Sequence, residues 1–83
     1  MQVSLATPEK IIFSGSADDV LLIADKGQIN LLDRHANLIT LVRKGPITLK
    51  AATGVLKFQV GDGVLKVEDN KVSILCGEIS ASA

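Results

Sequence analysis

Residues 56–76 read LKFQVGDGVLKVEDNKVSILC, and this stretch decides the fold class. Apolar and polar side chains alternate in it, and strict alternation places the apolar side chains on one face of a half-buried strand. The alternating runs are separated by groups of residues that tolerate tight turns. The runs are Leu56–Val60, Leu65–Val67 and Val72–Cys76, and the turns are Gly61-Asp62-Gly63 and Glu68-Asp69-Asn70.

The same pattern continues outward from this stretch. Ile47–Ala52 alternates, and near the N-terminus Val3 and Leu5 alternate with polar neighbours. No segment carries the apolar period of an amphipathic helix. Strands with a turn signal about every 8–12 residues are typical of an antiparallel sandwich or barrel. We therefore expect one all-β domain over residues 1–83.

Two runs break the alternation and are apolar on both faces. They are Val20–Ala24 and Leu38–Val42. Such strands are either central and covered on both sides, or they meet a partner, because sandwich strands normally keep one solvated face. Both readings stay open from the sequence.

Composition excludes several classes of protein. Nine basic residues balance nine acidic ones, and the only aromatic side chains are two phenylalanines. Nucleic-acid binding calls for a basic surface and stacking rings, so we expect no nucleic-acid partner. The apolar runs are too short to span a bilayer, and the N-terminal residues have no signal-peptide pattern. A single cysteine indicates a reducing compartment.

Residues that could carry chemistry are sparse. His35 follows Asp33-Arg34, and an Asp-x-His pair can belong to a catalytic relay or a metal site. A relay also needs a nucleophile, and a zinc site needs three or four ligands, whereas the chain has one histidine and one cysteine. We expect a structural or interface role for His35 and a buried, unreactive Cys76. No catalytic residue, metal site or cofactor is predicted.

Several short motifs occur in a fixed order along the chain. They are Thr7-Pro8-Glu9 with Ile12-Phe13-Ser14-Gly15, then RHANLIT at 34–40, DGVLKV at 62–67 and NKVSIL at 70–75. In this order they resemble the T-P-E…F-S-G, G-H-A-P-L-[IL]-T and G-G-F-L-E-V signatures of one family. That family is the N-terminal domain of the ε subunit of bacterial and chloroplast ATP synthases, called δ in mitochondria. The resemblance covers residues 3–78.

The sequence departs from the family pattern mainly in one loop. Asp33-Arg34 stand where the family has Pro-Gly, and Asn37 stands where it has proline after alanine. Asn30 replaces a family glycine, and asparagine is one of the few residues that tolerate a left-handed backbone. In the family, this loop faces the membrane ring.

The resemblance implies a β-sandwich of about ten short strands in two sheets. It also implies a non-catalytic rotor part of an F-type ATP synthase, in the central stalk. There the domain lies against the γ subunit and on the c-ring and links them in proton-driven ATP synthesis, with no cofactor. The expected location is peripheral, at the cytoplasmic face of a bacterial inner membrane or its organelle equivalent. We expect a monomer in isolation, and no counterpart here of the helical hairpin that follows in the family.

The resemblance also assigns two partner surfaces. Its c-ring-facing positions are Gln28, Leu31, Leu32, Arg34 and His35, and its γ-facing positions are Thr7, Leu38 and Thr40. Part of this has a physical basis, because adjacent strand residues point to opposite faces, so either Leu31 or Leu32 should lie outside the core.

Two other functions remain possible from the sequence. One is a free-standing β-sandwich interaction module unrelated to ATP synthase, which would fail to bind γ. The other is a small β-barrel enzyme or ligand carrier, which should show a pocket with convergent polar groups.

Overall fold

The computed structural model describes residues 1–81, in which every regular element is a strand. This confirms the predicted all-β class, and the predicted turn segments do separate consecutive strands. The strands are β1 Gln2–Ala6, β2 Ile11–Ser16, β3 Asp19–Ala24, β4 Gly27–Leu32, β5 Leu38–Val42, β6 Gly45–Ala51, β7 Gly54–Val60, β8 Gly63–Glu68, β9 Lys71–Cys76 and β10 Ile79–Ala81.

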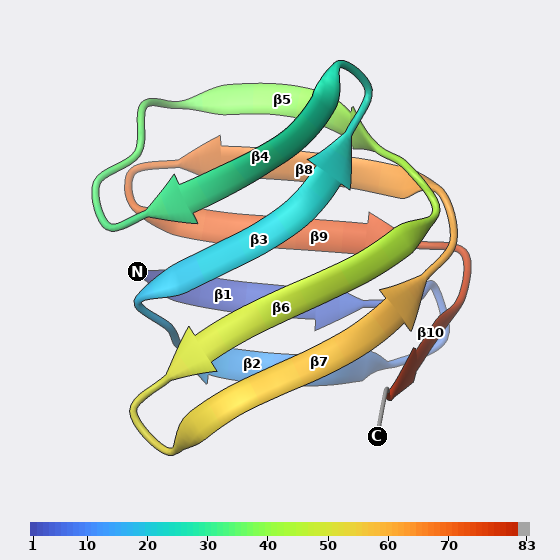
Figure 1. The fold of residues 1–83 in the computed structure, drawn as a ribbon, viewed down its shortest axis with the longest axis horizontal. Helices are drawn as coiled ribbons and strands as arrows, with labels where there is room; N and C mark the ends of the chain where they lie inside the picture. Colours follow the sequence, from blue (N-terminus) through green and yellow to red (C-terminus); the bar gives the residue numbers. More distant parts are fainter. Residues whose placement is uncertain (82–83) are drawn as a thin grey trace.

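The strands form the two layers of a sandwich (Figure 1). Sheet I has the order β4-β3-β6-β7-β10, and sheet II has the order β5-β8-β9-β1-β2. The sheets join at one corner, where Ala24 of β3 pairs with Val42 of β5. The hydrogen-bonded path is therefore continuous, and the chain folds over at this corner to close the core.

One strand pair departs from the antiparallel expectation. β1 runs parallel to β9, with Gln2 opposite Lys71 and Ala6 opposite Leu75. Parallel neighbours need a long connection, and here the connection is most of the chain. All other strand pairs among residues 1–81 are antiparallel.

The core is aliphatic and lies between the inner faces of the two sheets. Its members are the inward residues of the period-two pattern, and burying each large aliphatic side chain contributes about 1.5–3 kcal/mol. No polar or charged residue is buried among residues 1–81. The fully buried side chains are Val3, Leu5, Val20, Leu22, Leu31, Val42, Ile47, Leu49, Leu65, Val67, Val72 and Ile74.

Gly63 permits the close approach of β8 and β9. A Cβ atom at this position would lie 2.1 Å from the Leu75 carbonyl oxygen and 2.7 Å from Cys76 Cα. Both contacts are with backbone, which cannot move aside as a flexible side chain can. Only glycine fits here without displacing β9.

The two doubly apolar runs have different surroundings. In β3, Leu21 and Ile23 point away from the core but are half-buried. In β5, Ile39 and Leu41 are 72% and 47% exposed. The outer face of β3 is therefore partly covered, whereas the outer face of β5 is open.

Candidate protein-interaction site

The outer face of sheet II carries a continuous row of aliphatic side chains. Leu41, Val64, Leu75 and Ile11 are 47%, 44%, 50% and 65% exposed, and Ala6 is half-buried between them. We call these five residues the aliphatic row. Contiguous exposed apolar surface makes this face a candidate for binding a partner, whereas apolar residues scattered singly need no such explanation.

The strand register brings the aliphatic row together. Leu41 lies opposite Val64, Val64 opposite Leu75, Leu75 opposite Ala6, and Ala6 opposite Ile11. Directly opposed side chains are about 5 Å apart, so the row crosses five strands over roughly 20 Å. Residues far apart in the sequence thus form one surface.

Sheet I presents a different outer face. One of its cross-strand rows consists of Asn30, Leu21, Thr48 and Lys57, which we call the polar row. Beside it, Asp19 accepts a hydrogen bond from Asn30 Nδ2 and lies 3.9 Å from Lys50 Nζ. Three of the four members of the polar row are polar, so it offers no continuous apolar surface.

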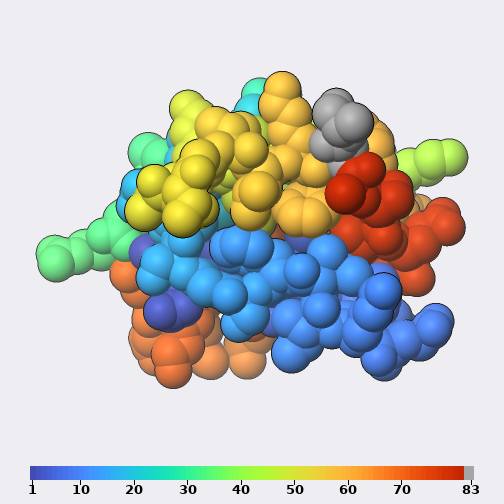
Figure 2. Space-filling model, turned by 90° about the horizontal axis from the view of Figure 1, so that it is seen from below, coloured from blue at the N-terminus to red at the C-terminus, as the bar shows by residue number. Residues whose placement is uncertain are grey.

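The predicted c-ring-facing residues do not all gather at one place. Leu32 is 52% exposed, and Arg34 and His35 follow it in the turn after β4. This turn lies at one end of the molecule, where the green chain between β4 and β5 projects in Figure 2. Gln28 is exposed on the same outer face of β4 as Leu32, but near the opposite end of that strand.

Leu31 corrects the predicted c-ring surface. Its side chain is fully buried and packs in the core, because it points to the opposite face of β4 from Leu32. One member of this pair lies outside the core, as expected, and that member is Leu32. Leu31 can support the surface from inside but cannot contact a partner.

The predicted γ-facing residues lie beside the aliphatic row. Leu38 and Thr40 are half-buried on the inward side of β5, so the side chains that β5 exposes are those of Ile39 and Leu41. Thr7 follows Ala6, and its Oγ1 accepts hydrogen bonds from the backbone N of Glu9 and Lys10. The prediction missed the row itself, although the adjacent apolar pairs Val64-Leu65 and Ile74-Leu75 signal outward aliphatic positions.

A polar network surrounds the turn after β4. Asp33 Oδ1 accepts hydrogen bonds from the Met1 ammonium group and from Asn70 Nδ2, each at 2.9 Å. The ammonium bond is the main reason why the pKa of Asp33 lies below its ordinary value, and the Asn70 bond and the ammonium charge add to it. Asn70 Oδ1 accepts from the Arg34 backbone N at 2.7 Å.

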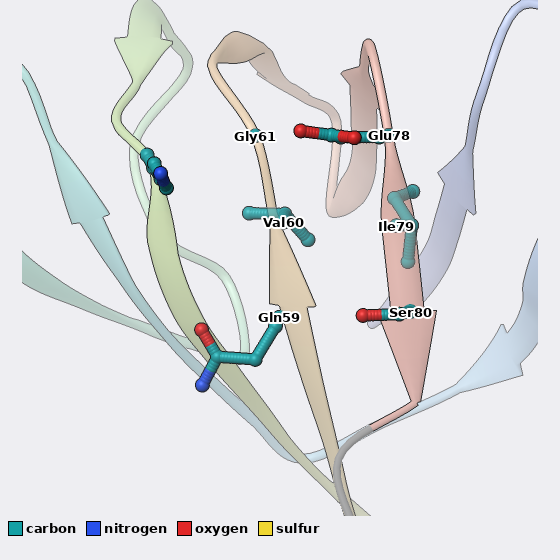
Figure 3. A pocket seen from close by; sticks show the side chains of 7 residues that line it. Gln59, Val60, Gly61, Glu78, Ile79 and Ser80 are labelled. Carbon is teal, nitrogen blue, oxygen red and sulfur yellow. The ribbon is translucent and has the colours of Figure 1, made fainter.

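A hollow of about 310 Å³ lies where β7 meets β10. Figure 3 shows Glu78 and Ser80 extending towards β7, with Val60 and Ile79 between them. Lys44 and Gln59 complete the polar lining. Among residues 1–81, no hydrogen bond or ion pair joins the side chains of this lining to one another, so the hollow contains no nucleophile held by a base.

Neither His35 nor Cys76 belongs to the lining of the hollow. His35 Nδ1 makes a 2.8 Å hydrogen bond with the carbonyl oxygen of Ala36. Burial and the nearby Asp62 charge raise the pKa of the Cys76 thiol, so the reactive thiolate is disfavoured. Within the part of the chain that the structure describes, no three His, Cys, Asp or Glu residues are grouped to hold a metal ion.

A membrane-spanning helix requires a long apolar stretch. No helix in residues 1–81 is long and apolar enough to cross a bilayer.

Two solved structures share the fold. One is a chain of the Euglena gracilis mitochondrial ATP synthase (OSCP/F1/c-ring, rotational state 1), with a TM-score of 0.88 and 16% identity over 95% of this chain and 51% of that one. The other is a chain of the Tetrahymena thermophila mitochondrial ATP synthase (central stalk/c-ring), with a TM-score of 0.83 and 17% identity over 96% and 65% of the two chains. At these identities the likeness concerns the fold alone.

Sequence comparison identifies the family. The chain is 34% identical over 76 residues to the chloroplastic ATP synthase epsilon chain of Emiliania huxleyi, covering 92% of this chain and 58% of that protein. It thus spans little more than half the length of this relative. The family described as ATP synthase, Delta/Epsilon chain, beta-sandwich domain matches residues 1–82. The aliphatic row and the projecting turn therefore lie on a chain that belongs to the ATP synthase delta/epsilon β-sandwich family.

Proposed function

We propose that this chain is a non-catalytic central-stalk (rotor) component of an F-type ATP synthase, which links the γ subunit to the c-ring during proton-driven ATP synthesis. The observation that carries the proposal is the aliphatic row on a domain of the delta/epsilon family. A rotor link needs a stiff body with binding surfaces, and a close-packed aliphatic sandwich is such a body.

In this proposal the aliphatic row, with neighbouring Ile39 and Thr7, binds γ. Four row members expose large aliphatic side chains to solvent in the isolated domain. Covering them with the apolar surface of a partner would remove this area from water, which is the main driving force of permanent assemblies. Leu38 and Thr40 then act from the half-buried side of β5, holding the strand rather than forming the centre of the contact.

The turn Leu32–His35 binds the c-ring in this proposal, with Gln28 at the far end of β4. The charge of Arg34 suits acidic or amide groups on polar ring loops. The aliphatic row and this turn lie towards opposite ends of sheet II, separated by most of the length of β8, or about 15 Å. That separation supports simultaneous binding of two partners.

The proposed location follows from the assembly. The domain would be peripheral and held at the membrane by its partners, at the cytoplasmic face of a bacterial inner membrane or the equivalent face in an organelle. The chloroplastic relative supports the organelle reading as well.

The test measures binding of the 83-residue chain to γ and to the c-ring of its own organism. Val64→Lys introduces a charge into the aliphatic row and should weaken γ binding by about tenfold or more, as central apolar contacts do. Val55→Lys is the matched control, because Val55 is a comparably exposed strand valine (54% against 44%) that lies in sheet I.

The outcomes distinguish a wrong stalk function from a wrong assignment of the γ surface. If the parent binds neither partner, the stalk function is wrong and a free-standing interaction module takes its place. If the parent binds γ but both lysine variants bind equally well, the function stands and the aliphatic row is not the γ surface.

A further inference from the structure

The turn after β4 has a conformation that its own residues do not favour. His35 N donates to the Leu32 carbonyl oxygen at 3.1 Å, which closes a four-residue turn. Arg34, its third residue, has a φ of 64°, whereas Asp33 is not among the positive-φ residues. A turn in which the third residue alone has a positive φ is a type II turn. Such a turn favours proline at its second position and glycine at its third. Here those positions are Asp33 and Arg34.

A bulky residue in the left-handed region persists only when its surroundings hold it. The Asn70 side chain contacts both central residues of the turn. Its Oδ1 accepts from the Arg34 backbone N at 2.7 Å, and its Nδ2 donates to Asp33 Oδ1 at 2.9 Å. One amide group therefore binds the turn at two successive residues.

Asn70 is well placed for this contact because it belongs to a tight hairpin. Asp69 and Asn70 connect β8 to β9 with φ values of 51° and 64°, as in a type I′ turn. The hairpin is bound to the same loop a second time, since Asp69 N donates to Asn37 Oδ1 at 3.0 Å. The β8–β9 hairpin and the β4–β5 loop meet at one end of the sandwich, next to the N-terminus (Figure 1).

We propose that Asn70 is a positioning residue, which holds the turn Leu32–His35 in its type II conformation and so sets how Arg34 and His35 meet a partner. The inference rests on the proposed function for the partner, here the c-ring. In this role the hairpin amide supplies the constraint that proline and glycine would supply from within the turn. The Met1 ammonium group also donates to Asp33, but within residues 1–81 it makes no hydrogen bond to the Arg34 backbone.

The variant that tests this is Asn70→Gly. Glycine accepts the positive φ of Asn70 at no steric cost, so the hairpin is kept and only the side-chain amide is lost. Asp69→Gly is the matched control, because it makes the same change at the neighbouring positive-φ position. Among residues 1–81, the Asp69 side chain makes no hydrogen bond or ion pair, and its backbone N–H to Asn37 remains.

The first measurement needs no partner. Amide hydrogen exchange of the isolated chain should be about tenfold faster at Arg34 in Asn70→Gly, the effect expected for losing one hydrogen bond, and unchanged in Asp69→Gly. His35 N–H, which closes the turn, should also exchange faster. Adding Arg34→Gly to Asn70→Gly should restore protection at His35, because glycine adopts the turn conformation unaided. Parental exchange at Arg34 in Asn70→Gly overturns the proposal.

The second measurement is binding to the c-ring. Asn70→Gly should bind about threefold to tenfold more weakly, while its cooperative thermal unfolding shows that it stays fully folded at the temperature of the binding measurement. A looser turn with unchanged binding overturns the positioning role. If the parent itself does not bind the c-ring, the proposed partner is wrong, and the exchange measurement still decides whether Asn70 holds the turn.

Discussion

The outer faces of the two sheets are built from the same alternating strands, yet they differ in chemistry. Sheet II exposes the aliphatic row, whereas sheet I exposes the polar row, beside which Asp19 accepts a hydrogen bond from Asn30 and pairs with Lys50. The inner faces are alike and share one aliphatic core. The core is formed by the inner faces, so the outer faces are free to differ. An apolar outer face is what a domain needs when a partner covers it.

The largest expected effect is a loss of unfolding free energy when the core shared by the two sheets is disrupted. Leu65 in sheet II and Leu49 in sheet I are both fully buried. Replacing either leucine by alanine should cost about 2–5 kcal/mol of unfolding free energy, since each leaves a cavity in the same core. Urea denaturation measures this cost. A loss below about 1 kcal/mol for one of them would mean that its sheet is not part of the common core.

The second effect separates the two outer faces directly. In a Cys76→Ala background, Leu75→Cys places a thiol on the aliphatic row and Lys57→Cys places one on the polar row. Both thiols should react with a maleimide about a hundredfold faster than the buried Cys76 of the parent, whose raised pKa also disfavours the thiolate.

Addition of γ should protect the thiol at position 75 and leave the thiol at position 57 reactive. Equal protection of both thiols would refute the assignment of the γ surface to sheet II, and protection of position 57 alone would move it to sheet I.

A smaller effect is expected at Arg34, in the projecting turn that leads from β4 of sheet I towards β5 of sheet II. Arg34→Glu should weaken c-ring binding about threefold to tenfold at low salt and less at high salt, because exposed charges act mainly through screened attraction. Titration at two ionic strengths measures the difference, with Lys57→Glu as a charge-matched control on the polar row. A salt-independent loss would indicate that the variant turn is misfolded.

The smallest effect is a pH dependence at the same turn. The pKa of Asp33 is lowered in the folded state by the Met1 ammonium group. Its contribution to stability is therefore present above the ordinary value of 3.8 and is lost as the pH falls through the lower folded-state pKa. Acid unfolding of Asp33→Asn should lack this part of the slope below pH 3.8. Identical curves for parent and variant would show that the ammonium contact is absent in solution.

Much of the fold could be predicted from the chain alone. The alternation in residues 56–76 determined three strands, their turns and the inward residues Leu65, Val67, Val72 and Ile74. The same rule predicted that Leu31 and Leu32 face opposite ways, but it could not say which of them lies inside. That choice depends on which face of β4 covers the core, and only packing decides it.

The tertiary structure decided which exposed residues become neighbours. Periodicity describes one strand at a time, so it does not contain the parallel pairing of β1 with β9 that joins Ala6 to Leu75. The limits of the domain over residues 1–83 and the two partner surfaces stay predictions.

The loop after β4 also shows the difference between what the sequence predicts and what the tertiary structure decides. From the sequence, Asp33-Arg34 in place of Pro-Gly is only a departure from a family pattern. The fold brings Asn70 from a distant hairpin within 2.7 Å of Arg34 N and holds the turn from outside. Local chemistry therefore determined the strands and their inward faces, because side-chain alternation is a property of neighbouring residues. The aliphatic row and the contacts of Asn70 with the turn join residues far apart in the chain, and only the packed sandwich creates those contacts.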